Sequence, residues 1–168
     1  MKRMIFVRAT TFFFAFSTWV AQAAMQPKDS FSWNAEFVAL DEGSKTLTVK
    51  APGFGEHLAG DFGRLKAGER VMLRWSGLDI YADSIVRGLR ADEVKTEERF
   101  TFPVEFVSFD ADRKYITFKF AVPEASLAHI KTVKPGEWIT ATSPHGSAGK
   151  ATPIAAIRPY VTTTGTSK

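Results

Sequence analysis

Several short runs of the chain alternate between apolar and polar residues, which is the period-two pattern of half-buried β-strands. The runs KTLTVK at 45–50 and KYITFKF at 114–120 place an apolar residue at every second position. The run RVMLRW at 70–75 predicts a strand with Val71, Leu73 and Trp75 inward and with Arg70, Met72 and Arg74 outward. In WITAT at 138–142 the same alternation turns Ile139 and Ala141 inward and leaves Trp138, Thr140 and Thr142 outward.

Residues between these runs predict how the strands are connected. DEGSK at 41–45 and DADRK at 110–114 are rich in turn formers, so each predicts a β-hairpin. PEASLAHI at 123–130 has Pro at the start and spaced apolar residues, which predicts a short helix. PGFGEHLAGDFG at 52–63 contains four glycines and predicts a loop or at most one helical turn. Gly68 and Gly136, each followed by Glu, are expected at a positive φ.

The two hairpins belong to an internal repeat. Segment 31–50 aligns with 100–119, and eight of the 20 positions are identical: Phe31/Phe100, Glu36/Glu105, Phe37/Phe106, Val38/Val107, Asp41/Asp110, Lys45/Lys114, Thr48/Thr117 and Lys50/Lys119. The match continues to a fourth strand, where DSIVRGL near Asp83 aligns with AAIRPYV near Ala155. The pattern predicts an all-β chain of two tandem small barrels of the OB or SH3-like kind. One barrel built from both repeats is the alternative.

The repeat divides the chain into segments. The first unit spans 31–89 and the second 100–161, and the charged segment 90–99 is predicted to be their linker. The tail 162–168 has nothing to bury and is expected to be disordered.

The N-terminus predicts export. A basic start, an uncharged Phe-rich stretch and AQA at 21–23 form the three-part pattern of a signal peptide over residues 1–23. The uncharged stretch, 9–24, is shorter than the roughly 20 residues of a spanning helix. We therefore expect a periplasmic or secreted protein with no stable membrane insertion after cleavage. Its oligomeric state is left open by the sequence.

Charge and cysteine content exclude several classes of function. Three of the 22 Lys and Arg lie in the predicted signal peptide, so 19 remain against 18 Asp and Glu, and a nucleic-acid partner is not expected. Without any Cys there is no thiolate nucleophile and no thiolate metal site. DFG at 61–63 and HGSAGK at 145–150 lack the other parts of a kinase or a P-loop. No catalytic residues and no cofactor are predicted, and the chain is expected not to be an enzyme.

The combination of Asp41, Thr48 and Lys50 with LKAGERVMLRW at 65–75 resembles small periplasmic OB-like barrel proteins of bacteria, including the copper-chaperone type. That resemblance implies a barrel fold and, in the copper chaperones, a site of His, Trp and two Met spaced by one residue. This chain has no Met-x-Met, so the metal motif is not matched. The alternative metal ligands are His57, His129 and His145, if their loops converge.

Differences between the repeats suggest where a partner binds. Arg70 of the first unit aligns with Trp138 of the second, and Arg74 aligns with Thr142. Trp138, Arg70, Met72 and Arg74 are therefore the candidate partner-binding residues, although packing of Trp138 against the first unit or the linker is the alternative. The favoured hypothesis is an exported non-enzymatic binding or accessory protein that contacts another periplasmic protein. A periplasmic metal-handling protein is the first alternative, and a carbohydrate- or envelope-binding module using Trp138 and Tyr81 is the second.

Overall fold

The structure is a computed structural model that describes residues 30–78, 80–94, 100–145 and 154–161. The predicted signal peptide, the end of the predicted linker and the predicted tail lie outside these residues. The elements, in chain order, are β1 (Ser30–Asp41), β2 (Thr46–Pro52), α1 (Leu58–Gly63), β3 (Arg70–Leu78), β4 (Tyr81–Leu89), η2 (Ala91–Glu93), β5 (Thr101–Asp110), β6 (Tyr115–Ala121), α2 (Glu124–Ile130), β7 (Trp138–Pro144) and β8 (Ala156–Pro159). Within this described part, no helix is long and apolar enough to cross a membrane.

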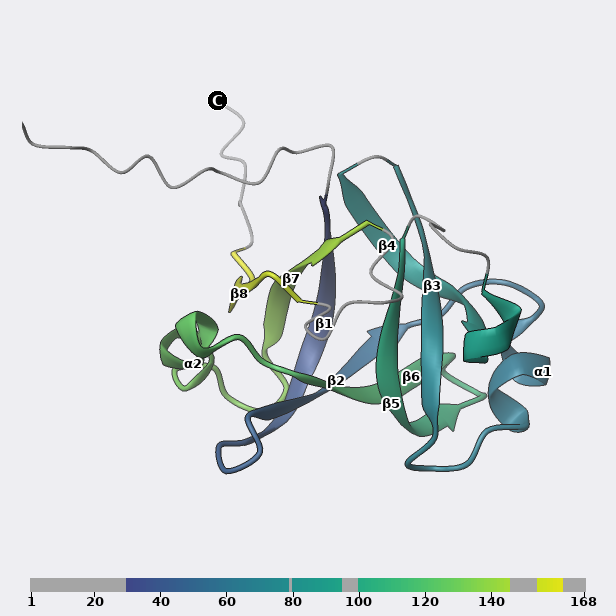
Figure 1. Ribbon diagram of the computed structural model, residues 1–168, viewed down its shortest axis with the longest axis horizontal. Helices are drawn as coiled ribbons and strands as arrows, with labels where there is room; N and C mark the ends of the chain where they lie inside the picture. Colours follow the sequence, from purple (N-terminus) through teal and green to yellow (C-terminus); the bar gives the residue numbers. More distant parts are fainter. Residues whose placement is uncertain (1–29, 79, 95–99, 146–153, 162–168) are drawn as a thin grey trace, which may run out of the picture.

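Eight strands form one sheet in the order β2-β6-β5-β3-β4-β1-β7-β8, and the additional β1–β2 pairing closes the first six into a barrel (Figure 1). Both halves of the sequence supply strands to this single barrel, so the prediction of two tandem barrels is wrong and the alternative of one barrel holds. The physical reason is the size of the core. A barrel of about 60 residues buries a smaller fraction of its surface than one enclosure shared by both halves.

The two hairpins have matching geometry. β1–β2 shifts register between Phe37 and Ala39, and β5–β6 shifts between Phe106 and Ser108, 69 residues further on. Their turns each contain a lysine with positive φ, Lys45 at 52° and Lys114 at 56°. β2 and β6 pair antiparallel through Val49 and Phe118, which are equivalent positions of the sequence alignment. Residues that align in sequence thus occupy matching places in the two halves.

The third strand of each half pairs with the first strand of the other half. β3 lies beside β5, and β7 lies beside β1. The turns before these strands are held by reciprocal backbone hydrogen bonds across the halves: Gly68 N–H to Phe106 O (2.8 Å), Phe106 N–H to Glu69 O (2.8 Å), Gly136 N–H to Phe37 O (2.9 Å) and Phe37 N–H to Glu137 O (2.7 Å). Because the third strand of each half pairs with the first strand of the other half, neither half encloses a core of its own.

Gly68 and Gly136 have φ of 89° and 91°, which confirms the predicted positive φ. We expect Gly68→Ala and Gly136→Ala each to lower the free energy of unfolding by about 1 kcal/mol or more, because a Cβ disfavours this conformation. A Cβ added at either glycine would meet no atom within 4 Å, so the cost is confined to the backbone. Urea denaturation measures it. Gly60→Ala in α1 is the control, since a Cβ there also meets nothing within 4 Å and the φ of Gly60 lies outside the left-handed range. Equal stability of all three variants would contradict the assignment.

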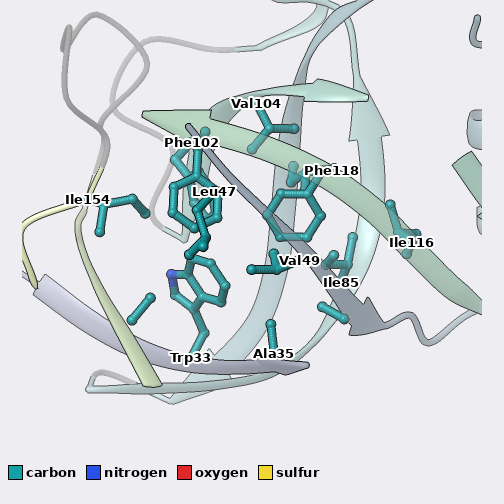
Figure 2. Close-up of a cluster of buried hydrophobic side chains, with 14 of the residues drawn as sticks. Trp33, Ala35, Leu47, Val49, Ile85, Phe102, Val104, Ile116, Phe118 and Ile154 are labelled. Carbon is teal, nitrogen blue, oxygen red and sulfur yellow. The ribbon is translucent and has the colours of Figure 1, made fainter. Parts of the chain in front are cut away.

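The core is dominated by aromatic rings from both halves. Trp33 of β1 is fully buried, and Figure 2 shows it pointing toward Leu47, Phe102 and Phe118. Its indole N–H donates to Ser143 Oγ at 2.7 Å. The ring centroid lies 4.8 Å from that of Trp75 and 5.3 Å from that of Phe102. Burial of such rings is the main stabilising contribution of the barrel.

Each helix supplies a polar side chain to a fourth strand. Asp61 of α1 accepts a hydrogen bond from Gly88 N–H of β4 at 3.2 Å. Ser126 of α2 accepts one from Ile157 N–H of β8 at 3.0 Å. These N–H groups are equivalent in the strand pairing, because Gly88 faces Leu73 and Ile157 faces Ala141. The helices thereby satisfy backbone donors at strand edges that would otherwise be open to another chain.

Two local predictions need correction. The segment 52–63 contains the six-residue helix α1 rather than a loop or a single turn, because Leu58 and Phe62, one helical turn apart, are both buried. The alignment of the fourth strands is also shifted: Gly88, not Ile85, takes the place of Ile157. Bulges in the β3–β4 pair change the register there. The predicted helix at 123–130 is present as α2.

Candidate functional site

The outer surface of four adjacent strands carries a group of polar and aromatic side chains. We call it the four-strand face and define it by these residues: Tyr81 of β4, Ser32 and Asn34 of β1, Trp138, Thr140 and Thr142 of β7, Arg158 of β8, and Tyr160, which follows β8. Strand register sets their neighbours. Asn34 lies opposite Thr140, and Thr140 lies opposite Arg158. The backbone N–H of Tyr160 donates to the Trp138 carbonyl at 2.9 Å, which places Tyr160 next to Trp138.

A chain of side-chain hydrogen bonds orders the centre of this face. Thr140 Oγ1 donates to Asn34 Oδ1 at 2.8 Å, and Asn34 Nδ2 donates to Tyr81 Oη at 2.7 Å. Beside it, the hydroxyls of Ser32 and Thr142 lie 3.3 Å apart. The two bonds to Asn34 fix its amide, and the amide in turn fixes the phenol of Tyr81. A binding surface ordered in this way loses less conformational entropy on binding.

A pocket of about 360 Å³ opens on the four-strand face. Its walls include Asn34, Thr140, Tyr81, Arg158 and Tyr160. Partial burial raises the pKa of Tyr81, with smaller contributions from Asp83 and Tyr160. The phenol therefore stays neutral at and above physiological pH and keeps both a donor and an acceptor. The pocket thus offers a guanidinium, two phenols, an amide and a hydroxyl within a ring-lined hollow.

Trp138 lies at the end of the four-strand face. Its side chain is 36% exposed, so it points outward as the alternation predicts, and it faces Glu36 across the β1–β7 pair. Glu36 forms an ion pair with Lys50 at 2.8 Å. At the matching place in the other half, Arg70 faces Glu105, which pairs with Lys119 at 3.1 Å. The two halves therefore share a Lys–Glu pair and differ in the residue beside it.

The prediction that Met72 faces outward as a contact residue is wrong, because its side chain is only 5% exposed. Met72 lies between Leu89 of β4 and Pro103 of β5 in the sheet, and η2 packs against β3. Apolar neighbours on both sides thus cover a position that alternation alone assigns to solvent. Arg70 and Arg74 on the same strand are exposed.

The predicted contact residues do not form one surface. Arg70 and Arg74 belong to β3, whereas Trp138 belongs to β7, and β4 and β1 lie between these strands in the sheet. Arg70 lines a pocket with Glu105 and Lys119, and Arg74 lines another with His57. Only Trp138 of the four lies on the four-strand face.

The three histidines also lie apart. His57 precedes α1 and His129 is on α2, and these helices lie on opposite sides of the molecule (Figure 1). His145 follows β7 and stacks on Phe31, with ring centroids 5.2 Å apart. No group of three or more His, Asp or Glu that could hold a metal ion occurs in the described ranges. The alternative shared site of His57, His129 and His145 is therefore not formed.

Comparison of the chain with protein-family models, with curated proteins and with solved structures finds no match.

Sequence reasoning missed most of the four-strand face, including Asn34, Thr140, Arg158 and Tyr160. A partial signal exists in SFSWNAEF at 30–37, where polar residues alternate with Phe31, Trp33, Ala35 and Phe37. That pattern shows that Asn34 points outward. It does not show that β1 pairs with β7, and this long-range pairing is what brings Asn34 to Thr140.

Proposed function

We propose that this chain is an exported, non-enzymatic binding or accessory protein that contacts another periplasmic protein through the four-strand face. The observation that supports the proposal most is the pairing of exposed aromatic side chains with an ordered polar centre. Tyr160 is 43% exposed and lines the same pocket as Asn34 and Tyr81, and Trp138, 36% exposed, lies next to Tyr160. Tyrosine, tryptophan and arginine are the residues most enriched at the energetic centres of protein interfaces.

A structural difference between the two halves also supports the four-strand face as the binding surface. We infer that the chain is a duplication of one unit, since the matched hairpins and the reciprocal Gly68 and Gly136 turns follow a single pattern. The fourth strands depart from it. β4 returns to pair with β1 and closes the barrel, whereas β8 extends beyond β7. The four-strand face therefore has no counterpart in the other half among the described residues. A surface that the repeated fold does not require is expected where one half has acquired a binding role.

Trp138→Ala is expected to leave the fold intact and to weaken partner binding by about 2 kcal/mol or more, as for truncated aromatic anchors. The protein is purified from periplasm together with the partner that it binds. Its intact mass is expected to match a chain that begins at Ala24 or Met25. Binding of the purified partner is then titrated against both forms. Phe54→Ala is the control, because Phe54 is 70% exposed and lies off the four-strand face. Equal loss in both variants, or none in Trp138→Ala, would reject the proposal.

A carbohydrate ligand is the second candidate, because the pocket joins ring faces to an ordered set of hydrogen-bonding groups. Sugar rings stack on aromatic faces while their hydroxyls exchange hydrogen bonds with amides and guanidinium groups. Titration with envelope glycan fragments separates this candidate from a protein partner. Saturable binding that is lost in Asn34→Ala, together with no protein partner, would favour the carbohydrate.

A further inference from the structure

The pocket on the four-strand face contains a basic side chain whose charge is not neutralised. Arg158 of β8 is exposed and lines this pocket. Its guanidinium forms no ion pair or hydrogen bond with any residue that the structure describes. Other basic side chains of the surface pair with a carboxylate, namely Lys45, Lys50, Arg64, Arg87, Lys119 and Lys131. The charge of Arg158 is therefore available to a group that binds from outside.

No acidic residue is found among the described residues that line this pocket. The acid that acts on the Tyr81 phenol is Asp83 of β4. Because β1 and β7 separate β4 from β8, Asp83 and Arg158 lie on strands about 14 Å apart, which is three strand spacings. Exposed charges at that separation are largely screened at physiological ionic strength. The part of the pocket formed by β8 is therefore positively charged.

The hydrogen bonds across the pocket run in one direction. Thr140 donates to Asn34, and Asn34 donates to Tyr81 Oη. Since Tyr81 Oη already accepts from the amide, its own O–H is left to donate. Neither this O–H nor that of Tyr160 has an acceptor within the part of the chain that the structure describes. The pocket thus combines a guanidinium with two hydroxyl donors that the fold leaves unused.

A carboxylate is complementary to these donors. It carries a negative charge, and both of its oxygens accept hydrogen bonds while neither donates. Arginine pairs with a carboxylate in a planar two-point geometry, and such charge-assisted hydrogen bonds are stronger than neutral ones. A neutral amide or alcohol could accept from the hydroxyls but would leave the charge of Arg158 without a counterion. The pocket therefore favours a carboxylate over a neutral polar group.

We propose that an aspartate or glutamate side chain of the partner protein enters this pocket, where its carboxylate pairs with Arg158 and accepts from Tyr81 Oη. This inference rests on the proposed function, because it names the chemistry of the partner at the same face. A side chain that projects from a protein surface also allows that surface to cover Trp138, which is 36% exposed next to Tyr160. A free chain end or a small acid would fill the pocket alone. Arg158 thereby selects among partners by charge.

Titration of the purified protein with blocked tripeptides, followed by NMR, tests the pocket without the partner. The acidic probe is acetyl-alanyl-glutamyl-alanine amide, and the neutral probe has glutamine in place of glutamate. We expect saturable shifts of the Asn34 side-chain amide with the acidic probe, and binding of the neutral probe at least about tenfold weaker. Arg158→Gln is expected to weaken the acidic probe about tenfold or more, the effect of one charge-assisted hydrogen bond. Tyr81→Phe removes only a hydroxyl and should weaken it by a smaller factor.

Arg70→Gln is the matched control, because Arg70 is also an exposed arginine but lines a different pocket, with Glu105 and Lys119. It removes the same charge and should leave the affinity for the acidic probe unchanged. Thermal unfolding of each variant checks that the barrel is intact. Equal weakening in Arg70→Gln and Arg158→Gln would reduce the effect to net charge and overturn the proposal. Absence of saturable binding of the acidic probe, or equally tight binding of the neutral probe, would also overturn it.

Two further probes test the source of the carboxylate. Acetyl-trialanine offers only a chain-end carboxylate, and glucuronate offers the carboxylate of a sugar. If either binds more tightly than the acidic tripeptide, the assignment to an acidic side chain of a protein is overturned.

Failure of this inference can be told apart from failure of the proposed function. A partner that is weakened by Trp138→Ala but binds Arg158→Gln as tightly as the parent would uphold the proposed function and overturn the carboxylate site. Binding of the acidic probe that is lost in Arg158→Gln would support the carboxylate site even if Trp138→Ala left partner binding unchanged. That second result would reject only the proposed function.

Discussion

Trp33→Ala is expected to lower the free energy of unfolding by about 3–5 kcal/mol, the range for truncating a fully buried aromatic side chain. Trp33 has no exposed surface and contacts rings from both halves of the chain, among them Phe102 and Phe118. Its removal leaves a cavity between strands that the closed barrel holds apart. Such a loss is a large part of the total stability of a small domain. Urea denaturation followed by far-ultraviolet circular dichroism measures it.

Two milder changes keep this test informative if Trp33→Ala does not fold. Ser143→Ala leaves the Trp33 indole N–H buried without its acceptor and should cost about 1–3 kcal/mol. Trp33→Phe keeps most of the ring packing and should cost less than Trp33→Ala. A loss below about 1 kcal/mol in Trp33→Ala, under the range for buried truncations, would show that Trp33 is not the centre of the core.

Asp61→Ala is expected to lower the free energy of unfolding by about 1–3 kcal/mol, mainly because the Gly88 N–H loses its acceptor. The ion pair with Arg87 should add little, since Arg87 is 37% exposed and reaches water. The same substitution also removes the carboxylate that orients the Arg87 guanidinium. Urea denaturation measures the loss of stability.

Asp61→Asn separates these two roles. Its amide oxygen still accepts from Gly88 N–H, so the stability should be closer to that of the parent than to Asp61→Ala. The charge that pairs with Arg87 is lost in both variants, so the difference in stability between them measures the hydrogen bond to Gly88. If Asp61→Asn is as unstable as Asp61→Ala, the ion pair outweighs the backbone hydrogen bond, contrary to this assignment.

Strand positions, positive φ angles and side-chain directions were predictable from the sequence where residues close in the chain determine them. The alternation in 45–50 and 114–120 was sufficient to predict β2 and β6, because a half-buried strand needs only a period of two. The positive φ at Gly68 and Gly136 followed from glycine beside turn residues. Trp138 was likewise predicted to point outward. In each case the relevant physical interaction acts within a few residues.

The sequence by itself determined the strands, the hairpins and the special turns of this protein, because pleat and φ preferences are local properties. Tertiary structure alone decided that both halves share one barrel. The alternation of apolar and polar residues in a strand is the same whether the strand pairs within its own half or with a strand of the other half. Tertiary structure also decided that Met72 is buried, because Leu89 and Pro103 come to flank it only after β3 has paired on both sides. The pocket on the four-strand face arises in the same way. Asn34 meets Thr140 through a strand register that is fixed only when the closed barrel buries its aromatic core.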